Sequence, residues 1–312
     1  MTVSSFYKLI FGQKVYKISL DGGCTCPNRD GTVGTGGCIF CSATGSGDFV
    51  PNKSLSISEQ IEKAKSLVES KNSKKTDKSE KKYIAYFQNF TNTYGNPSTL
   101  LSNWEEALAK PEIVGLAIGT RPDCLNDKIL SILSNLANKT FLQIELGLQT
   151  TNEKTASYIR RGYINECYFD AIKKLKKANP KIHIVTHVIF GLPGDSEEDM
   201  IKTVKDVICA KSDGIKITNL YILKDTDLEK DYLNNKVFPL TMEEYFDLIK
   251  KALKIIPPEV VIHRLTGDPP KKLLIAPKWS TDKKRTLNIV NSLLGKCLQD
   301  VSKLWYINLL WI

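Results

Sequence analysis

Short apolar runs alternate with longer amphipathic segments along most of the chain. The short runs are rich in β-branched and aromatic residues and predict strands, whereas the longer segments have the apolar spacing of helices. The predicted strands are residues 15–20, 83–88, 114–120, 141–149, 182–190 and 214–223. The predicted helices are residues 56–70, 98–109, 126–137, 153–178 in two pieces, 196–210 and 241–256. This alternation indicates right-handed βαβ units that share a parallel sheet.

Six such units predict an α/β protein with a partial (β/α)6 TIM-like barrel and a small C-terminal α/β extension. A chain of 312 residues exceeds the size at which a single core usually stops growing, which favours a barrel with an appendage. We expect the barrel, including an N-terminal cysteine-rich loop, over residues 1–235. The extension over residues 236–312 is expected to contact substrate or RNA. Reactive groups of such barrels lie at the carboxyl ends of the strands.

Four cysteines, Cys24, Cys26, Cys38 and Cys41, follow the first predicted strand within the stretch CTCPNRDGTVGTGGCIFC. This position puts them at the expected mouth of the barrel. Four thiolates satisfy a closed tetrahedral zinc site, which is one hypothesis. The other is an iron–sulfur cluster on Cys26, Cys38 and Cys41 alone, with one iron left open for a substrate or cofactor.

The net charge is +10, and part of the excess lies in residues 269–286, where lysines and an arginine surround Trp279. Basic residues interleaved with an aromatic suit a phosphate backbone and a stacked base, although lysine-rich surfaces also occur without a partner. Eight cysteines and an N-terminus without a secretory signal lead us to expect a reducing compartment, the cytoplasm or an equivalent organelle. No apolar run reaches the roughly 20 residues that cross a bilayer, so we expect no membrane partner.

Several long motifs in one order resemble the radical S-adenosylmethionine (SAM) superfamily, and within it the YhcC/YtqA-like group. They are YKISLDGGCTCPNRDGTVGTGGCIFCSATGSGDF, IGTRPDCL, IELGLQTTNEKTASYIRRGY, HVIFGLPGDSEEDM, GIKITNLYILKDTDL and VVIHRLTGDPPKKLLIAPKW. The resemblance runs from about residue 11 to about residue 291 and includes the group's C-x11-C-x2-C spacing. It implies a [4Fe–4S] cluster on Cys26, Cys38 and Cys41, with SAM on the open iron. Reductive cleavage of SAM would then give a 5′-deoxyadenosyl radical, and Cys24 would be an additional thiol.

The resemblance also implies which residues surround the cofactor and the substrate. The expected cofactor-binding residues are Phe40, Asn89, Thr91, Gln149, Arg161, His187 and Leu192. The alternatives are plain structural roles: polar groups at a strand exit for Gln149 and Arg161, a satisfied core histidine for His187, and a turn at Leu192. The expected substrate-contacting residues are Arg121, His263, Arg264, Asp268, Lys278 and Trp279. For Arg121 the alternative is a strand exit, and for His263, Arg264 and Asp268 it is a solvent-facing ion pair.

The motif combination also resembles the radical SAM domain of the Elongator catalytic subunit. This implies tRNA as the partner, conversion of a wobble-uridine 5-substituent from carboxymethylaminomethyl towards aminomethyl, and an electron donor such as flavodoxin or ferredoxin. Phosphate contacts would supply affinity, and a flipped anticodon base would reach the radical. Two alternatives stay open: radical chemistry on a small metabolite, and a zinc-stabilised nucleic-acid-binding protein that uses all four cysteines.

Overall fold

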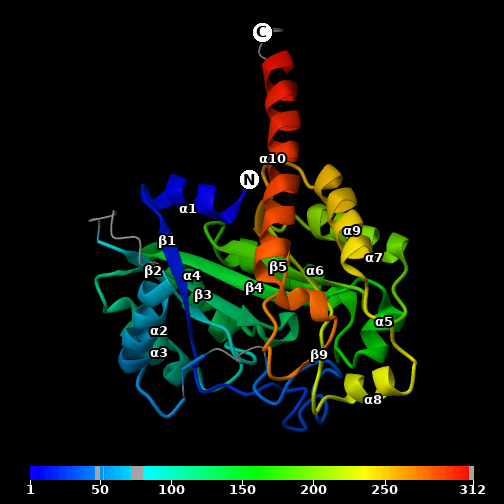
Figure 1. Cartoon of the computed structure of the whole chain (residues 1–312). Helices are drawn as coiled ribbons and strands as arrows, with labels where there is room; N and C mark the ends of the chain where they lie inside the picture. The colour runs from blue at the N-terminus through cyan, green and yellow to red at the C-terminus, as the bar shows by residue number, and fades with distance from the viewer. Residues whose placement is uncertain (46–49, 52, 72–79, 309–312) are drawn as a thin grey trace.

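Seven parallel strands form a curled half-barrel in the computed structural model, which describes residues 1–45, 50–51, 53–71 and 80–308 (Figure 1). The strands are β1 (Val15–Leu20), β2 (Lys82–Phe87), β3 (Ile113–Thr120), β4 (Phe141–Gln149), β5 (His183–Phe190), β6 (Gly214–Asn219) and β8 (Val261–Arg264). They lie in the order β1-β2-β3-β4-β5-β6-β8. Spatial order follows chain order, as expected of successive right-handed βαβ units. The predicted α/β partial barrel is therefore confirmed.

Helices cover the outer face of this sheet and enclose the main hydrophobic core (Figure 1). They are α2 (Ile57–Lys71), α3 (Pro97–Leu108), α4 (Asp127–Lys139), α6 (Asn165–Ala178), α7 (Glu197–Cys209) and α9 (Met242–Ile255). Leu133 of α4 and Ile249 of α9, for example, share one buried cluster with Ile144 of β4. A short helix, α5 (Glu153–Tyr158), precedes α6, so the segment predicted as a helix in two pieces is found as such.

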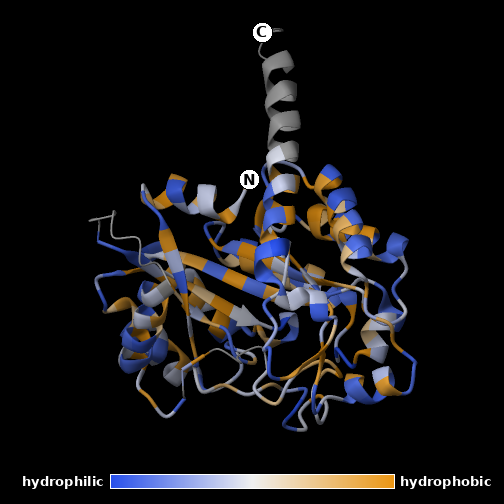
Figure 2. Ribbon diagram, in the orientation of Figure 1, coloured by the Kyte–Doolittle hydropathy of each residue, from blue (hydrophilic) through white to orange (hydrophobic). Residues whose placement is uncertain are grey.

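Alternate strand residues face opposite sides of the sheet, and this alternation creates the site. On β4, Leu146 belongs to the main core, whereas Glu145 and Gln149 line a cavity on the concave side. On β6, Ile217 is in the core and Lys216 lines the cavity. Figure 2 shows the resulting change between apolar and polar residues along the strands. The convex face therefore carries the core, and the concave face carries the polar groups.

The seventh strand, β8, comes from the range that we expected to form the extension. It pairs in parallel with β6, so the sheet has one strand more than the six predicted. The predicted strand 214–223 is wrong as a single element, because β6 ends at Asn219. The chain then forms β7 (Ile222–Leu223), which pairs antiparallel with β9 (Leu274–Ala276). The division of the chain at residue 235 stays a prediction.

Helix α1 (Val3–Phe11) closes one end of the half-barrel, opposite the end where α8 (Asp227–Leu233) and β9 lie (Figure 1). The ring of Phe6 stacks on His183 with centroids 4.5 Å apart. The hydroxyl of Tyr7 donates to Gln143 Oε1 at 3.0 Å. The last helix, α10 (Lys283–Asn308), follows β9. No helix in the described part of the chain combines the length and apolar character needed to cross a membrane.

Candidate active site

The concave side of the half-barrel contains a cavity of about 360 Å³ that extends from the cysteine loop to inward-facing residues of the strands. Cys26, Cys38 and Cys41 are part of its lining. The other predicted site residues in the lining are Phe40, Thr91, Arg121, Gln149, Arg161, His187, Arg264 and Asp268. Segments far apart in the sequence thus meet in one cavity at the carboxyl ends of the strands, as a barrel requires.

Hydrogen bonds hold the cysteine loop against the segment that follows α5. Asn28 Nδ2 donates to the carbonyl of Arg160 at 2.5 Å and lies 3.7 Å from Cys38 Sγ. Arg29 donates to the carbonyls of Cys41 and Ser42 at 3.1 and 2.6 Å. These bonds between side chains and backbone carbonyls hold the loop in place. The thiols of Cys26, Cys38 and Cys41 are therefore positioned without forming a disulfide.

The thiols of Cys26, Cys38 and Cys41 fit a three-ligand cluster. Burial, assisted by the nearby Cys41, raises the pKa of the Cys38 thiol to about 12. A group that binds thiolates therefore has to displace this proton. Within the described residues, no three His, Cys, Asp or Glu side chains are arranged to hold one metal ion. A [4Fe–4S] cube does not need such convergence, because each thiolate binds a different iron.

Cys24 occupies different surroundings from the other three thiols. Its side chain packs against the main core, and its Sγ lies 3.9 Å from the carbonyl oxygen of Gly22. Burial raises its pKa to about 12. Cys24 is also outside the cavity lining. This placement argues against a zinc site on all four cysteines.

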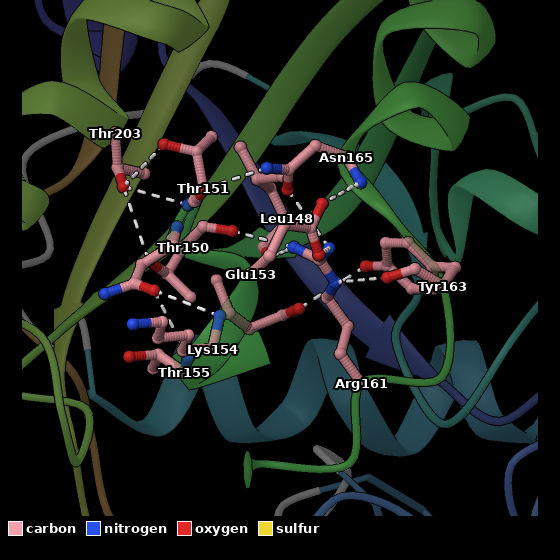
Figure 3. A network of polar contacts seen from close by, with 12 residues as sticks. Leu148, Thr150, Thr151, Glu153, Lys154, Thr155, Arg161, Tyr163, Asn165 and Thr203 are labelled. Atoms are coloured by element: carbon pink, nitrogen blue, oxygen red, sulfur yellow. Dashed lines mark hydrogen bonds and ion pairs between the residues drawn. The ribbon is translucent and has the colours of Figure 1, made fainter. Parts of the chain in front are cut away.

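Arg161 is only 1% exposed and binds the end of β4 (Figure 3). Its guanidinium has five N–H donors, and each finds an acceptor within the chain. The acceptors are the carbonyls of Leu148 (3.2 Å), Thr150 (2.7 Å) and Tyr163 (2.9 Å), Glu153 Oε2 (3.3 Å) and Asn165 Oδ1 (3.0 Å). No donor is left for a bound cofactor, so Arg161 positions the strand exit and is not placed to bind SAM through its side chain.

Tyr163 lies between two guanidinium groups at the same strand end. The guanidinium carbons of Arg121 and Arg161 are 4.9 and 4.6 Å from its ring centroid. Its hydroxyl donates to the carbonyl of Gly147 and lies 3.4 Å from Gln149 Oε1. Gln149 itself has a φ of 66°, where the register between β4 and β5 shifts. The chain is thus bent at the end of β4, and the side chain of Gln149 is held at the cavity.

Arg121 is likewise engaged within the chain, although it lines the cavity. Its Nε and Nη2 donate to the two carboxylate oxygens of Asp123 at 2.9 and 2.7 Å. Its Nη1 donates to the carbonyl of Arg161 at 2.9 Å. This arginine therefore joins the end of β3 to the segment after α5, and its charge is already matched by Asp123.

Glu145 lies at the centre of a polar cluster deeper in the cavity. Lys17 Nζ is 2.7 Å from its Oε1, while Lys216 and, at 2.7 Å, His187 Nε2 contact its Oε2. Burial opposes ionisation, but Lys17 and Lys216 hold the pKa of Glu145 well below its usual range. Burial lowers the pKa of Lys216 to about 7 despite the attraction of Glu145. Burial also lowers the pKa of His187, which keeps this imidazole neutral at pH 7.

Two predicted cofactor-binding residues lie outside the lining. Asn89 donates to Asp21 Oδ2 at 2.8 Å. Leu192 is buried in a small cluster with Ile39 and Ile159. Leu192 therefore packs in the same apolar cluster as Ile39 of the cysteine loop and supports that loop.

The predicted substrate contact at His263 is also outside the lining. Its Nε2 lies 2.9 Å from His183 Nε2, close to Phe6 of α1. This is the closed end of the half-barrel, so the placement does not support contact with substrate.

Lys278 and Trp279, which we predicted to contact substrate, also lie outside the lining. Lys278 Nζ donates to the carbonyl of Leu274 at 2.7 Å. The indole of Trp279 donates to the carbonyl of Leu240 at 3.0 Å, and its ring centroid is 5.5 Å from that of Tyr245. The ring of Trp279 is partly buried against α9, whereas Lys278 is exposed.

The charged residues Lys17, Glu145 and Lys216 are missing from our sequence-based predictions. Each is the one charged residue in its strand segment, in YKISL, FLQIELGLQ and GIKITN. Glu145 is four residues before Gln149, so the period of two puts both side chains on the same face. A charge in the middle of a buried strand was therefore the signal that could have identified this cluster.

Comparison with known proteins assigns the chain to a family. The chain matches the radical SAM superfamily over residues 31–207 and the radical SAM C-terminal domain over residues 212–296. It is 43% identical over 281 residues to YtqA of Bacillus subtilis (strain 168), covering 90% of this chain and 85% of that protein. It is 35% identical over 270 residues to YhcC of Escherichia coli (strain K12), covering 86% and 84%. Among solved structures, Elp3 of Methanocaldococcus infernus has a TM-score of 0.62 at 18% identity, covering 84% of this chain and 58% of that chain.

The first match covers more than half of the chain, and the two bacterial relatives match over most of their own length. The likeness to Elp3 concerns the fold. Members of the matched superfamily use a [4Fe–4S] cluster and SAM, the two cofactors that the sequence predicts. We conclude that the chain belongs to the radical SAM superfamily of enzymes.

Proposed function

We propose that this radical SAM enzyme acts on tRNA and converts a wobble-uridine 5-substituent from the carboxymethylaminomethyl towards the aminomethyl type. The two-carbon unit would leave as glyoxylate, with water supplying its oxygen and SAM acting as the two-electron oxidant that ends as methionine and 5′-deoxyadenosine. The observation that carries its enzymatic part is the presence of Cys26, Cys38 and Cys41 in one cavity with the strand-end polar residues. The RNA part is supported by two observations, the name of a distant relative and the positive charge beside the cavity lining.

Two distant relatives match about half of the chain, and the name of one of them refers to tRNA. The tRNA uridine(34) acetyltransferase of Methanocaldococcus jannaschii is 28% identical over 170 residues, which is 54% of this chain. Elongator complex protein 3 of Drosophila melanogaster is 28% identical over 170 residues, or 53% of this chain. The name of the acetyltransferase supports uridine 34 of tRNA as the target. Because each match covers only 30% of the relative, neither says anything about the reaction.

Under this proposal the chain's own residues hold and orient the two cofactors. Cys26, Cys38 and Cys41 bind the cluster, and Phe40, Thr91 and Gln149, which share the lining, contact SAM. When bound, the cofactors supply a radical that takes hydrogen from an unactivated carbon. Arg161 fixes the exit of β4, so that Gln149 keeps its position. The cavity walls keep water away from the reacting atoms.

Basic residues continue outward from the cavity. Asp268 and Pro270 are lining residues, and the exposed Lys271 and Lys272 follow directly in the chain. Phosphate contacts at these lysines would bring an anticodon nucleotide to the cavity, where a flipped base can enter. The predicted base stacking on Trp279 is not part of this proposal, because that ring packs against α9.

Radical SAM chemistry needs an electron donor, and we propose flavodoxin or ferredoxin for this role. Both are proteins of reducing compartments. We therefore assign the activity to the cytoplasm or to an equivalent organelle.

The test uses anaerobically reconstituted protein with SAM, a reductant and tRNA that carries 5-carboxymethylaminomethyluridine at the wobble position. Mass spectrometry of the digested nucleosides should show conversion to 5-aminomethyluridine that depends on SAM. Cys26→Ser should lose both this activity and the absorption band at roughly 400 nm. Cys24→Ser should keep both, since Cys24 is outside the cavity lining.

Cleavage of SAM with an unchanged tRNA would reject the RNA substrate and favour a small metabolite. Loss of the absorption band to the same extent in Cys24→Ser and Cys26→Ser would contradict the three-ligand assignment.

A further inference from the structure

The cavity floor carries more positive than negative groups. We define the floor as Tyr86, Glu145, His187, Lys216 and Arg264, which come from five different strands and all line the cavity. Glu145 is the carboxylate of this set, and His187 is neutral because burial lowers its pKa. Lys216 and Arg264 therefore face a single carboxylate.

That carboxylate already has a partner from outside the floor. Lys17 Nζ lies 2.7 Å from Glu145 Oε1, and Lys17 is not a lining residue. The ammonium groups of Lys17 and Lys216 lie 4.7 and 4.8 Å from the centroid of the Tyr86 ring. Lys17, which lies outside the lining, neutralises the charge of Glu145. The positive charge of Lys216, which is in the lining, therefore faces the cavity.

Arg264 adds a second cation beside Lys216. The two residues are register partners on β8 and β6, so their side chains leave the sheet on the same face. Within the described residues, Arg264 forms no ion pair. Asp268, the other carboxylate of the cavity lining, is engaged by Lys283 at 2.6 Å. Lys216 therefore shares the carboxylate of Glu145 with Lys17, and Arg264 has no carboxylate partner among the described residues.

Tyr221 provides an uncharged donor in the same cavity. It lines the cavity, and its buried hydroxyl has no hydrogen-bond partner among the described residues. A Cβ at Gly267 would lie 1.3 Å from this hydroxyl, so only glycine lets the loop after β8 pack here. Burial raises the pKa of Tyr221, which keeps the hydroxyl protonated. An unpaired buried hydroxyl is unfavourable, so an acceptor is expected at this position.

We propose that Lys216, Arg264 and Tyr221 form an anion site that binds a carboxylate of the substrate. Lys216 is mostly buried, with 11% of its side chain exposed, and the lower dielectric around it strengthens its attraction for an anion. The exposed Arg264 adds a second positive charge beside it. Two cations and one hydroxyl donor suit the two oxygens of a carboxylate. The identity of the ligand rests on the proposed function, because carboxymethylaminomethyluridine ends in a carboxylate.

The carboxylate of SAM is a poor candidate for this site. In the cofactor arrangement that the family implies, SAM binds the iron held by the cysteine loop at the ends of the strands. Lys216 lies three residues before the end of β6, which is about 10 Å deeper along the strand. The floor is therefore available to the second ligand of the reaction.

Affinity for the carboxylate should depend on pH, because the pKa of Lys216 is about 7. The groups that face Lys216 are Lys17 of β1, Tyr86 of β2, Glu145 of β4, His187 of β5 and Arg264 of β8. A bound carboxylate favours the ammonium form. Binding is therefore strongest below pH 7 and weakens as the pH rises above it.

The test measures binding of 5-carboxymethylaminomethyluridine and of its carboxamide to reconstituted protein with SAM, by anaerobic calorimetry. In the wild type the carboxylate should bind about tenfold or more tightly than the amide at pH 6.5, because charge-assisted pairs are roughly twice as strong as neutral ones. Lys216→Met and Arg264→Gln should each bring this ratio towards one. Lys173→Met, whose side chain is 78% exposed on α6, should leave it unchanged.

Thermal unfolding and iron content show whether each variant is folded and loaded, and Lys216→Arg should retain most of the preference for the acid. Equal binding of acid and amide by the wild type would overturn the anion site. It would leave the proposed function standing, provided that the modified tRNA is still converted. If the wild type prefers the acid but converts no tRNA, the anion site stands and the proposed function fails.

Discussion

At the scale of single residues, Arg161 supports the site without facing its ligands. It is 1% exposed, and its guanidinium satisfies carbonyls of Leu148, Thr150 and Tyr163. Arg161→Met would leave several of these acceptors buried and unpaired, each at about 1–3 kcal/mol. We therefore expect the free energy of unfolding to fall by about 3–5 kcal/mol in chemical denaturation, as for other broken buried networks.

The preceding residue offers a matched control. The side chain of Arg160 is 42% exposed and pairs with Asp227, so Arg160→Met should change stability by less than about 1 kcal/mol. An Arg161→Met protein of unchanged stability that no longer binds SAM would contradict the structural role. Such a result would support the cofactor contact that the family resemblance implies.

Motifs at strand ends allowed us to predict much of the site lining, because the carboxyl ends of barrel strands converge whatever the details of packing. Cys38, Gln149 and Arg264 are examples of predicted residues that line the cavity. The packing of Trp279 on Tyr245 was not predicted, because the sequence shows the basic neighbours of Trp279 but not the rings that contact it in the fold. A sequence also does not show which acceptors a guanidinium will meet in the fold. We therefore could not predict that all five N–H donors of Arg161 are used within the chain.

At the scale of elements, α1 and β8 meet at the closed end of the half-barrel. His263 of β8 lies beside His183 of β5, and Phe6 of α1 stacks on His183. Neither α1 nor β8 was predicted, because β8 has only four residues and α1 lies before the first repeating unit. Conversely, apolar residues continue past β6 to residue 223, but the chain leaves the sheet after Asn219. Propensity does not detect such a departure, which depends on packing partners.

The two histidines make this closed end sensitive to acid. Burial lowers the pKa of His183 to about 4 and that of His263 well below its usual range, whereas both have a pKa near 6.5 when unfolded. Their folded-state pKa values are depressed, so their contribution to stability is complete above pH 6.5 and decreases as the pH falls towards 4. For His183 alone the loss is about 2 kcal/mol at pH 5.

Urea denaturation of the wild type and of His183→Asn at pH 7 and pH 5 measures this contribution. Other titrating groups are common to both proteins and cancel in the comparison. We expect the wild type to lose about 2 kcal/mol more than the variant between the two pH values. A difference that does not change with pH would mean that His183 titrates normally in the folded state.

At the scale of the whole molecule, the fold separates three tasks along one cavity. The cysteine loop lies at the strand ends, the cationic floor lies deeper between β6 and β8, and Lys271 and Lys272 follow the rim. The separation arises from the sheet itself, because one face of each strand supplies the core and the other supplies the cavity. Substitutions in one region should therefore leave the other two functioning.

The rim lysines provide a test of this separation. Each phosphate contact adds about 0.7–0.9 to the slope of log affinity against log salt concentration. Lys271→Ala with Lys272→Ala should therefore weaken tRNA binding most at low salt and reduce the slope by about one to two. Anisotropy titrations at several KCl concentrations measure both quantities. The same protein should keep the wild-type preference for the carboxylate nucleoside over its amide, since neither lysine lines the cavity.

The control is Lys173→Ala with Lys202→Ala, which removes the same charge from two exposed positions on the outer helices. Long-range attraction by the net charge of +10 would lower affinity equally in both double variants. Direct contact at the rim would lower it only in the first, because a counter-ion is released only where a phosphate is bound. Equal losses would therefore remove the rim from the RNA-binding surface and leave the cavity as the remaining source of specificity.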